Sequence, residues 1–195
     1  MDNKFHGNFT QQDGLPEIAI ERATRVLRSG RLHRYNLGKD EIGEVGSLEL
    51  EFAKFINVKY CLAVASGGYT LSTALRALGV GHGDNVLTNA FTLAPVPGAI
   101  ASVGATPIFV GVNENLVIDF DDLEAKSQNA QVLMLSHMRG HICDMDRLLS
   151  ICASNNIQLI EDCAHTMGAK WGDRWSGTCL LYTSPSPRDQ RGSGI

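Results

Sequence analysis

The chain has 195 residues, a formal net charge of −4 and an apolar fraction of 44%. This length can bury a sizeable core in one domain, and the acidic balance argues against a nucleic-acid partner, which usually requires a basic face. No apolar run reaches membrane-spanning length and no signal-peptide core is seen, so no membrane partner is expected. The five cysteines are scattered and form no Cys-x-x-Cys pair, which indicates reduced thiols and a cytoplasmic location.

Two helices are predicted near the start of the chain, at 16–29 and 45–56, because apolar side chains recur on one face of each. After them, strand and helix patterns alternate. The expected strands are 60–65, 85–88, 106–110, 132–136 and 158–160, and the expected helices between them are 70–78, 95–103, 120–125 and 144–153. Continuous apolar strands in this βαβα order predict an α/β fold with a mostly parallel sheet that helices cover on both faces.

The C-terminal tail, 179–195, leaves this pattern and turns to Ser, Pro, Arg and Gly with no apolar periodicity. One interpretation is a disordered terminus. We favour the other, that these residues are not native and are translated sequencing-adapter read-through at the end of an incomplete gene.

An acid and an imidazole follow the strand expected at 158–160. Glu161 and Asp162 end the apolar run, and His165 lies three residues after Asp162. A carboxylate there can hold the protonated ring nitrogen of a pyridine cofactor, and the imidazole can hydrogen-bond the phenolic oxygen of that ring. The alternative is a helix N-cap aspartate beside a packed histidine. Cys163 is expected to be a packing residue and not a nucleophile.

A second candidate site is the turn between 60–65 and 70–78, which begins Ser66-Gly67-Gly68 and ends at Thr70. Glycines let backbone amides approach a ligand, and a helix N-terminus attracts anions, so the turn is consistent with a phosphate cradle to which the two hydroxyls add donors. The alternative is an ordinary strand-to-helix turn with Thr70 as the N-cap.

Two further patterns are weaker. His137, His141 and Cys143 suggest a metal site, but they lack a zinc-binding spacing, and we expect no metal. The glycines of 79–83 follow a helix and precede a strand, the reverse of a dinucleotide-binding motif, so they indicate a cap and a turn.

With these residues in view, the chain resembles the DegT/DnrJ/StrS-type sugar aminotransferases, which are pyridoxal-phosphate enzymes of aspartate-aminotransferase fold type I. The resemblance runs from about residue 30 to 178. Its ordered motifs are Ala-Ser-Gly at 65–67, Leu-Gly-Val-Gly-His-Gly-Asp-Asn-Val at 78–86, Gly-Ala-Thr-Pro-Ile-Phe-Val at 104–110, His-Met-Arg-Gly at 137–140, Asp-Met-Asp at 144–146 and Glu-Asp-Cys-Ala-His at 161–165. It implies that 1–178 is a C-terminally truncated large domain of that fold.

By this resemblance, Ser66, Gly67, Gly68 and neighbouring amides would hold the phosphate of pyridoxal 5'-phosphate. Asp162 would pair with the pyridinium nitrogen, and His165 would lie near the phenolic oxygen.

Three positions depart from the family pattern. Gly68 stands where the family usually has threonine, and Gly111 stands where an acid is usual. Leu93 aligns with the aromatic residue that stacks on the cofactor ring, and Phe91, two residues earlier, is the expected substitute.

The largest departure is a missing lysine. Transamination needs a lysine that bonds covalently to the cofactor and then moves a proton, and the family supplies it in a Ser-x-x-Lys segment beyond the region that ends at Thr178. The last lysine of this chain is Lys170, in an expected hairpin turn at 170–174 with an exposed side chain. No residue is therefore assigned as the Schiff-base lysine.

The resemblance implies transfer of an amino group from an amino-acid donor such as glutamate to a keto-sugar, often nucleotide-linked, in polysaccharide or secondary-metabolite biosynthesis. It also implies a homodimer, and it makes the chain as given an inactive fragment. Two alternatives stay open. One is a sugar dehydratase of the same family, in which histidine replaces the lysine. The other is a non-catalytic remnant that binds a phosphorylated ligand.

Overall fold

The computed structural model describes residues 14–35 and 37–178. These residues belong to two compact units, which divide between Leu50 and Glu51. The tail at 179–195, for which a non-native or disordered sequence is expected, lies outside the described residues, so that prediction stays untested.

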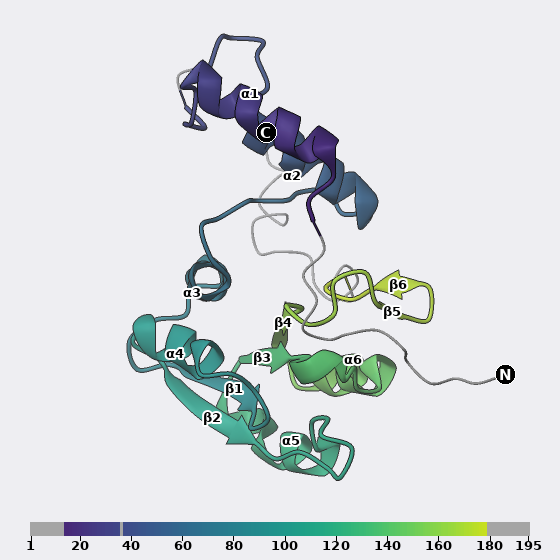
Figure 1. Ribbon diagram of the computed structural model, residues 1–195. Coiled ribbons are helices and arrows are strands. Elements are labelled where there is room, and N and C mark those ends of the chain that lie inside the picture. Colours follow the sequence, from purple (N-terminus) through teal and green to yellow (C-terminus); the bar gives the residue numbers. More distant parts are fainter. Residues whose placement is uncertain (1–13, 36, 179–195) are drawn as a thin grey trace, which may run out of the picture. The chain divides into compact units, whose positions relative to one another are not determined.

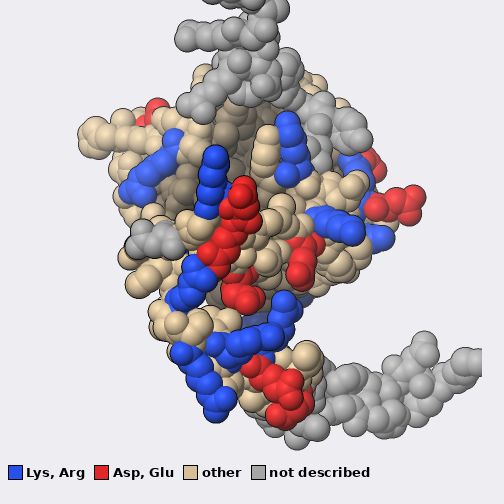
Figure 2. All heavy atoms as spheres, turned by 90° about the horizontal axis from the view of Figure 1, so that it is seen from above, with Lys and Arg blue, Asp and Glu red and all other residues tan. Residues whose placement is uncertain are grey.

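The first unit contains α1 (Glu17–Ser29) and the start of α2 (Glu44–Phe55). No residue of α1 is buried, and Gly30 ends the helix in the left-handed conformation at φ 67°, as the sequence predicts. Arg31 donates to Glu41 at 2.7 Å in the loop between the helices. Acidic and basic side chains are interspersed on the face drawn in Figure 2, which shows no patch of a single sign.

The second unit is built on a four-stranded parallel sheet (Figure 1). Its strands are β1 (Asn85–Asn89), β2 (Thr106–Val110), β3 (Val132–Ser136) and β4 (Gln158–Asp162), in the order β2-β1-β3-β4. All pairings are parallel. The predicted α/β class and these four strands are confirmed.

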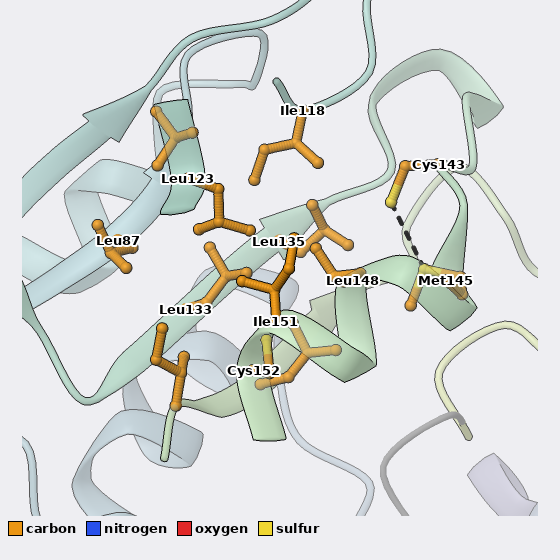
Figure 3. Packing of buried hydrophobic residues seen from close by; sticks show 13 residues of the cluster. Leu87, Ile118, Leu123, Leu133, Leu135, Cys143, Met145, Leu148, Ile151 and Cys152 are labelled. Carbon is orange, nitrogen blue, oxygen red and sulfur yellow. Dashed lines mark hydrogen bonds between the residues drawn. The ribbon is translucent and has the colours of Figure 1, made fainter. Parts of the chain in front are cut away.

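Two apolar clusters lie on the two faces of this sheet. Residues of α5 (Phe120–Lys126) and α6 (Met145–Ser154) pack with Leu87, Leu133 and Leu135, as Figure 3 shows. Residues of α3 (Gly67–Ala77) and α4 (Pro95–Ser102) pack with Val86 and Met134. Neighbouring positions of one strand face opposite sides, so the continuous apolar runs supply both cores.

The strand expected at 60–65 is wrong for this structure. Residues 60–65 pair with no strand of the described chain, and the side chains of Tyr60 and Leu62 are 78% and 61% exposed. An apolar run supplies β-propensity, but whether it forms a strand depends on tertiary context, which a local pattern does not encode. The following helix, expected at 70–78, begins earlier, at Gly67.

A short hairpin follows the sheet, with β5 (Lys170–Trp171) paired antiparallel to β6 (Arg174–Trp175). This confirms the turn expected at 170–174. Across it, the Lys170 ammonium lies 4.1 Å from the centre of the Trp175 ring. Among the described residues, every helix is too short or too polar to cross a bilayer.

The exposed run at 60–65 makes a testable contrast with the buried strand β3. We expect Leu133→Ala to lower the free energy of unfolding by about 2–5 kcal/mol, because Leu133 is fully buried. Leu62→Ala is the matched control, and its effect should stay within about 0.5 kcal/mol. Urea titration followed by circular dichroism measures both. An equal loss for the two variants would show that 60–65 is a buried element.

Candidate functional site

The carboxyl ends of three neighbouring strands carry polar side chains that contact one another. Asn89 ends β1, Ser136 ends β3 and Asp162 ends β4. The Asn89 side-chain oxygen accepts from the Ser136 amide at 2.8 Å, and the Ser136 hydroxyl donates to Asp162 Oδ2 at 3.0 Å. Ligands of open parallel sheets bind at this edge, so we take it as the candidate site.

Two protein donors hold the Asp162 carboxylate. Oδ2 accepts from Ser136, and Oδ1 accepts from the Ala164 amide at 3.2 Å. The bond to the Ala164 amide resembles the contact that an N-cap aspartate makes. Residues 163–178 contain no helix, so the alternative that Asp162 is a helix N-cap is wrong. A carboxylate has about four acceptor sites, so Asp162 keeps capacity for a cationic N–H group.

His165 is fixed by the strand end beside it. Its Nδ1 accepts from the Arg139 amide at 3.1 Å, in the 3₁₀ turn η2 (Met138–Gly140). Arg139 adopts φ 57°, which turns its amide away from regular helical geometry. Because Nδ1 accepts, the neutral ring carries its proton on Nε2, and that N–H group is a donor.

The glycine turn forms the start of α3. Ser66 is the N-cap, with its hydroxyl oxygen accepting from the Tyr69 amide at 3.3 Å, so the alternative that made Thr70 the N-cap is wrong. The Thr70 hydroxyl donates to the Ser66 carbonyl at 3.0 Å. Nothing lies within 4 Å of a Cβ built on Gly67 or Gly68, so this end is open. No hydrogen bond within the described ranges joins it to Asp162.

Phe91 is linked to the acid through Asn89. The Asn89 side-chain amide donates to the carbonyls of Phe91 at 2.8 Å and Ser136 at 3.1 Å. In the next position, the Thr92 hydroxyl is buried without a hydrogen-bond partner in the described part of the chain.

A group of possible metal ligands lies at the same strand ends. The ligand atoms of His137, Glu161 and Cys163 are within 4.8 Å of one another. Each of them already has a protein partner: the Glu161 carboxylate accepts from the His137 ring at 3.0 Å and from the Gly177 amide at 3.1 Å, and Cys163 accepts from the Ser176 hydroxyl at 3.3 Å. The contacts therefore describe a hydrogen-bonded network. The metal pattern considered in the sequence shares only His137 with this group.

A groove of about 670 Å³ lies at the opposite end of the sheet, where the strands begin. Amide side chains dominate its lining, and several bond to one another; the Asn155 oxygen accepts from Ser127 and from Gln128, both at 3.0 Å. These bonds tie the amino ends of β3 and β4 together. The groove shares no residue with the candidate site.

Comparison with known proteins identifies the family. The profile of the DegT/DnrJ/EryC1/StrS aminotransferase family matches residues 16–186. The chain belongs to this family. It is 40% identical over 129 residues to a putative L-glutamine:3-amino-2,3-dideoxy-scyllo-inosose aminotransferase of Micromonospora echinospora, covering 65% of this chain and 31% of that protein. It is 37% identical over 136 residues to GDP-perosamine synthase of Escherichia coli O157:H7, covering 69% and 37%.

Solved structures agree on the fold. An aminotransferase from Psychrobacter cryohalolentis superimposes with a TM-score of 0.78 at 30% identity, over 87% of this chain and 42% of that one. A putative sugar aminotransferase from Streptococcus pneumoniae, in its PLP form, gives 0.76 at 26% identity, over 86% and 45%. The α/β fold of PLP-dependent aminotransferases is therefore confirmed. The chain spans less than half the length of these relatives.

Asn89 and Ser136 belong to the candidate site but were not predicted from the sequence. A signal was available, because Asn89 and Ser136 are the polar residues that end buried runs, and the carboxyl ends of parallel strands meet at one edge. Their contact with Asp162 depends on strand order, which periodicity does not encode.

The rate of thiol alkylation tests whether Cys163 is a packing residue. Burial raises the pKa of Cys143 to about 12 and of Cys152 to about 11, and burial together with the nearby Glu161 charge raises the pKa of Cys163. The thiolate is the reactive form, so at pH 8 we expect all three to be alkylated more slowly than an unstructured cysteine peptide. Iodoacetamide labelling with peptide mapping measures this, and urea should abolish the difference. Faster labelling of Cys163 than of the peptide would reveal an activated thiol.

Proposed function

We propose that this chain is the cofactor-binding part of a PLP-dependent aminotransferase that moves an amino group from an amino-acid donor such as glutamate to a keto-sugar. The observation that carries the proposal is Asp162, a carboxylate at the carboxyl end of β4 that two protein donors hold and that retains free acceptor sites. Family membership supports the reaction class.

The residues present fit pyridoxal 5'-phosphate. Asp162 would accept from the ring nitrogen, and the Nε2 proton of His165 would be donated to the phenolic oxygen. Gly67 and Gly68 offer amides at an open helix N-terminus, which suits a phosphate group. Phe91 is the aromatic residue nearest in sequence to the Asn89 network and is proposed to contact the ring.

When bound, the cofactor supplies a protonated pyridine ring that withdraws electrons from the reacting carbon. The negative charge of Asp162 keeps a proton on the ring nitrogen, because a charge-assisted hydrogen bond favours the charged form of the pair. The Ser136 hydroxyl orients that carboxylate. The Ser66 hydroxyl accepts from its own helix and keeps its hydrogen for a phosphate oxygen.

The Schiff-base lysine is not assigned to any residue of this chain. The Lys170 ammonium lies over the Trp175 ring across the hairpin. We propose that the lysine and the remaining fold belong to a continuation of the native gene beyond residue 178.

The substrate class follows the relatives. Their names specify an amino-inosose and a GDP-linked amino sugar, and a third relative is a spore coat polysaccharide biosynthesis protein of Bacillus subtilis. We propose a keto-sugar substrate, often nucleotide-linked, with polysaccharide or secondary-metabolite biosynthesis as the context. A cytoplasmic homodimer is proposed for the full-length enzyme.

The role of Asp162 can be tested by cofactor titration. Asp162→Asn should weaken pyridoxal phosphate binding by about 10- to 150-fold, the equivalent of about 1.5–3 kcal/mol for a hydrogen bond to a charged group. Visible absorbance of the cofactor measures binding. Asp173→Asn, the same change at an exposed hairpin residue, should bind like the parent. Equal affinity of the Asp162 variant and the parent would refute the assignment.

Sequencing the source locus through the codons after Thr178 tests the continuation. We expect the reading frame to run into a Ser-x-x-Lys segment and a further domain, because the reaction needs a Schiff-base lysine and none is assigned in this chain. A histidine in place of that lysine would favour the dehydratase. A stop codon after Ile195 would leave the non-catalytic ligand-binding remnant.

A further inference from the structure

A buried histidine–glutamate pair lies directly behind the candidate cofactor acid. His137 Nε2 and Glu161 Oε2 are 3.0 Å apart, and their side chains are 1% and 2% exposed. The His137 amide also donates to the Asp162 carbonyl at 3.1 Å. Glu161 and Asp162 are neighbours on β4, so their side chains face opposite sides of the sheet. The pair thus contacts the acid through the backbone while its side chains lie on the other face.

The same glutamate holds the segment that follows the hairpin. Glu161 Oε2 accepts from the Gly177 amide at 3.1 Å. Gly177 adopts φ 85°, and a Cβ at that position would lie 3.1 Å from Cys163 Sγ, so the backbone packs closely against the strand end. One carboxylate oxygen therefore joins the end of β3, β4 and the residues that leave the hairpin.

Ser176 extends this link to the residues around His165. Its hydroxyl donates to Cys163 Sγ at 3.3 Å and shares a 2.8 Å hydrogen bond with the Thr166 hydroxyl. His165 thus lies between two anchors. Thr166 on one side bonds to Ser176, and the His165 ring on the other bonds to Arg139, two residues after His137.

We propose that His137 and Glu161 are positioning residues that clamp the segment 176–177 to the strand ends and thereby set the orientation of Asp162 and His165. That Asp162 and His165 contact the cofactor rests on the proposed function. Neither side chain touches the cofactor face. Their effect passes through the Asp162 backbone on one side and through Ser176 and Thr166 on the other.

The chain contains a reporter for the clamp. Its two tryptophans, Trp171 and Trp175, both lie in the hairpin that leads into the clamped segment (Figure 1). Trp171 Nε1 donates to Asp146 at 3.0 Å, and Arg174 bonds to the same carboxylate, which fixes the hairpin at the start of α6. Tryptophan emission and its quenching by acrylamide therefore report whether the hairpin stays docked.

The experiment compares Glu161→Ala, Glu161→Gln and His137→Gln in the 195-residue chain, with far-UV circular dichroism to confirm folding. We expect all three variants to show red-shifted tryptophan emission and stronger quenching by acrylamide. The change should be largest for Glu161→Ala, because Glu161→Gln keeps an acceptor oxygen for the Gly177 amide. The His137→Gln/Glu161→Gln double variant should lose less than the sum of its single variants, since the two side chains act as a pair. Glu114→Gln and His141→Gln, at exposed positions, are the matched controls and should match the parent.

Two further readouts separate positioning from general stability. Nitrogen NMR of the His165 ring should show the Nε2-protonated form in the parent and mixed tautomers in the clamp variants. The clamp variants should bind pyridoxal phosphate about tenfold more weakly than the parent. This is the loss expected when one hydrogen bond of about 1.4 kcal/mol no longer helps to orient Asp162 and His165. Ser176→Ala, which leaves both buried residues intact, should reproduce these changes in weaker form, and it carries the test if the other variants do not fold.

Folded clamp variants with parental emission and parental His165 signals would overturn the proposal. The proposal would also be overturned if EDTA changed both the tryptophan emission and the His165 signals of the parent. An ion bound by His137, Glu161 and Cys163 would then hold the segment in place. If the parent binds no cofactor, the proposed function fails, while emission and the His165 tautomer still decide whether the clamp exists.

Discussion

The parallel pairing of β3 with β4, in the register that sets Ser136 opposite Asp162, is the constraint from which the rest of the candidate site follows. It brings the Ser136 hydroxyl to the Asp162 carboxylate and the His137 amide to the Asp162 carbonyl. A shift of one residue would exchange the faces of the side chains, sending the acid into the cluster that packs under α6 and exposing Glu161. The shifted register would bury the Asp162 charge among apolar side chains and separate Glu161 from His137, so the observed register and the apolar pattern support each other.

The side chains of Asp162 and Glu161 lie on opposite faces of β4 and make different kinds of contact. On the face of the candidate site, Asp162 is hydrogen-bonded but keeps acceptor capacity, as a group that binds a cation requires. On the opposite face, Glu161 is buried and its contacts are made within the protein. A buried carboxylate is costly unless it is paired, and here its partners come from two other segments of the chain. The Glu161 carboxylate is paired inside the protein, and these hydrogen bonds connect the end of β3, β4 and the residues after the hairpin.

The sheet of the described chain ends at β4, the strand that carries Asp162. Among the described strands, β4 pairs only with β3, and 60–65 forms no strand. The relatives are more than twice as long as the matched part of this chain. The matched part of this chain is therefore less than half of the length of these relatives.

The sequence by itself determined the alternation of strands and helices, the glycine caps at Gly30, Gly79 and Gly104, the hairpin at 170–174 and the place of Asp162 at a strand end. These are local properties: side-chain periodicity, positive φ and turn composition act within a few residues. Only the tertiary structure decided that 60–65 is not a strand of the described sheet and that Asn89, Ser136 and Glu161 meet around the acid. Those outcomes depend on strand order and register, which are set by packing between residues far apart in the chain.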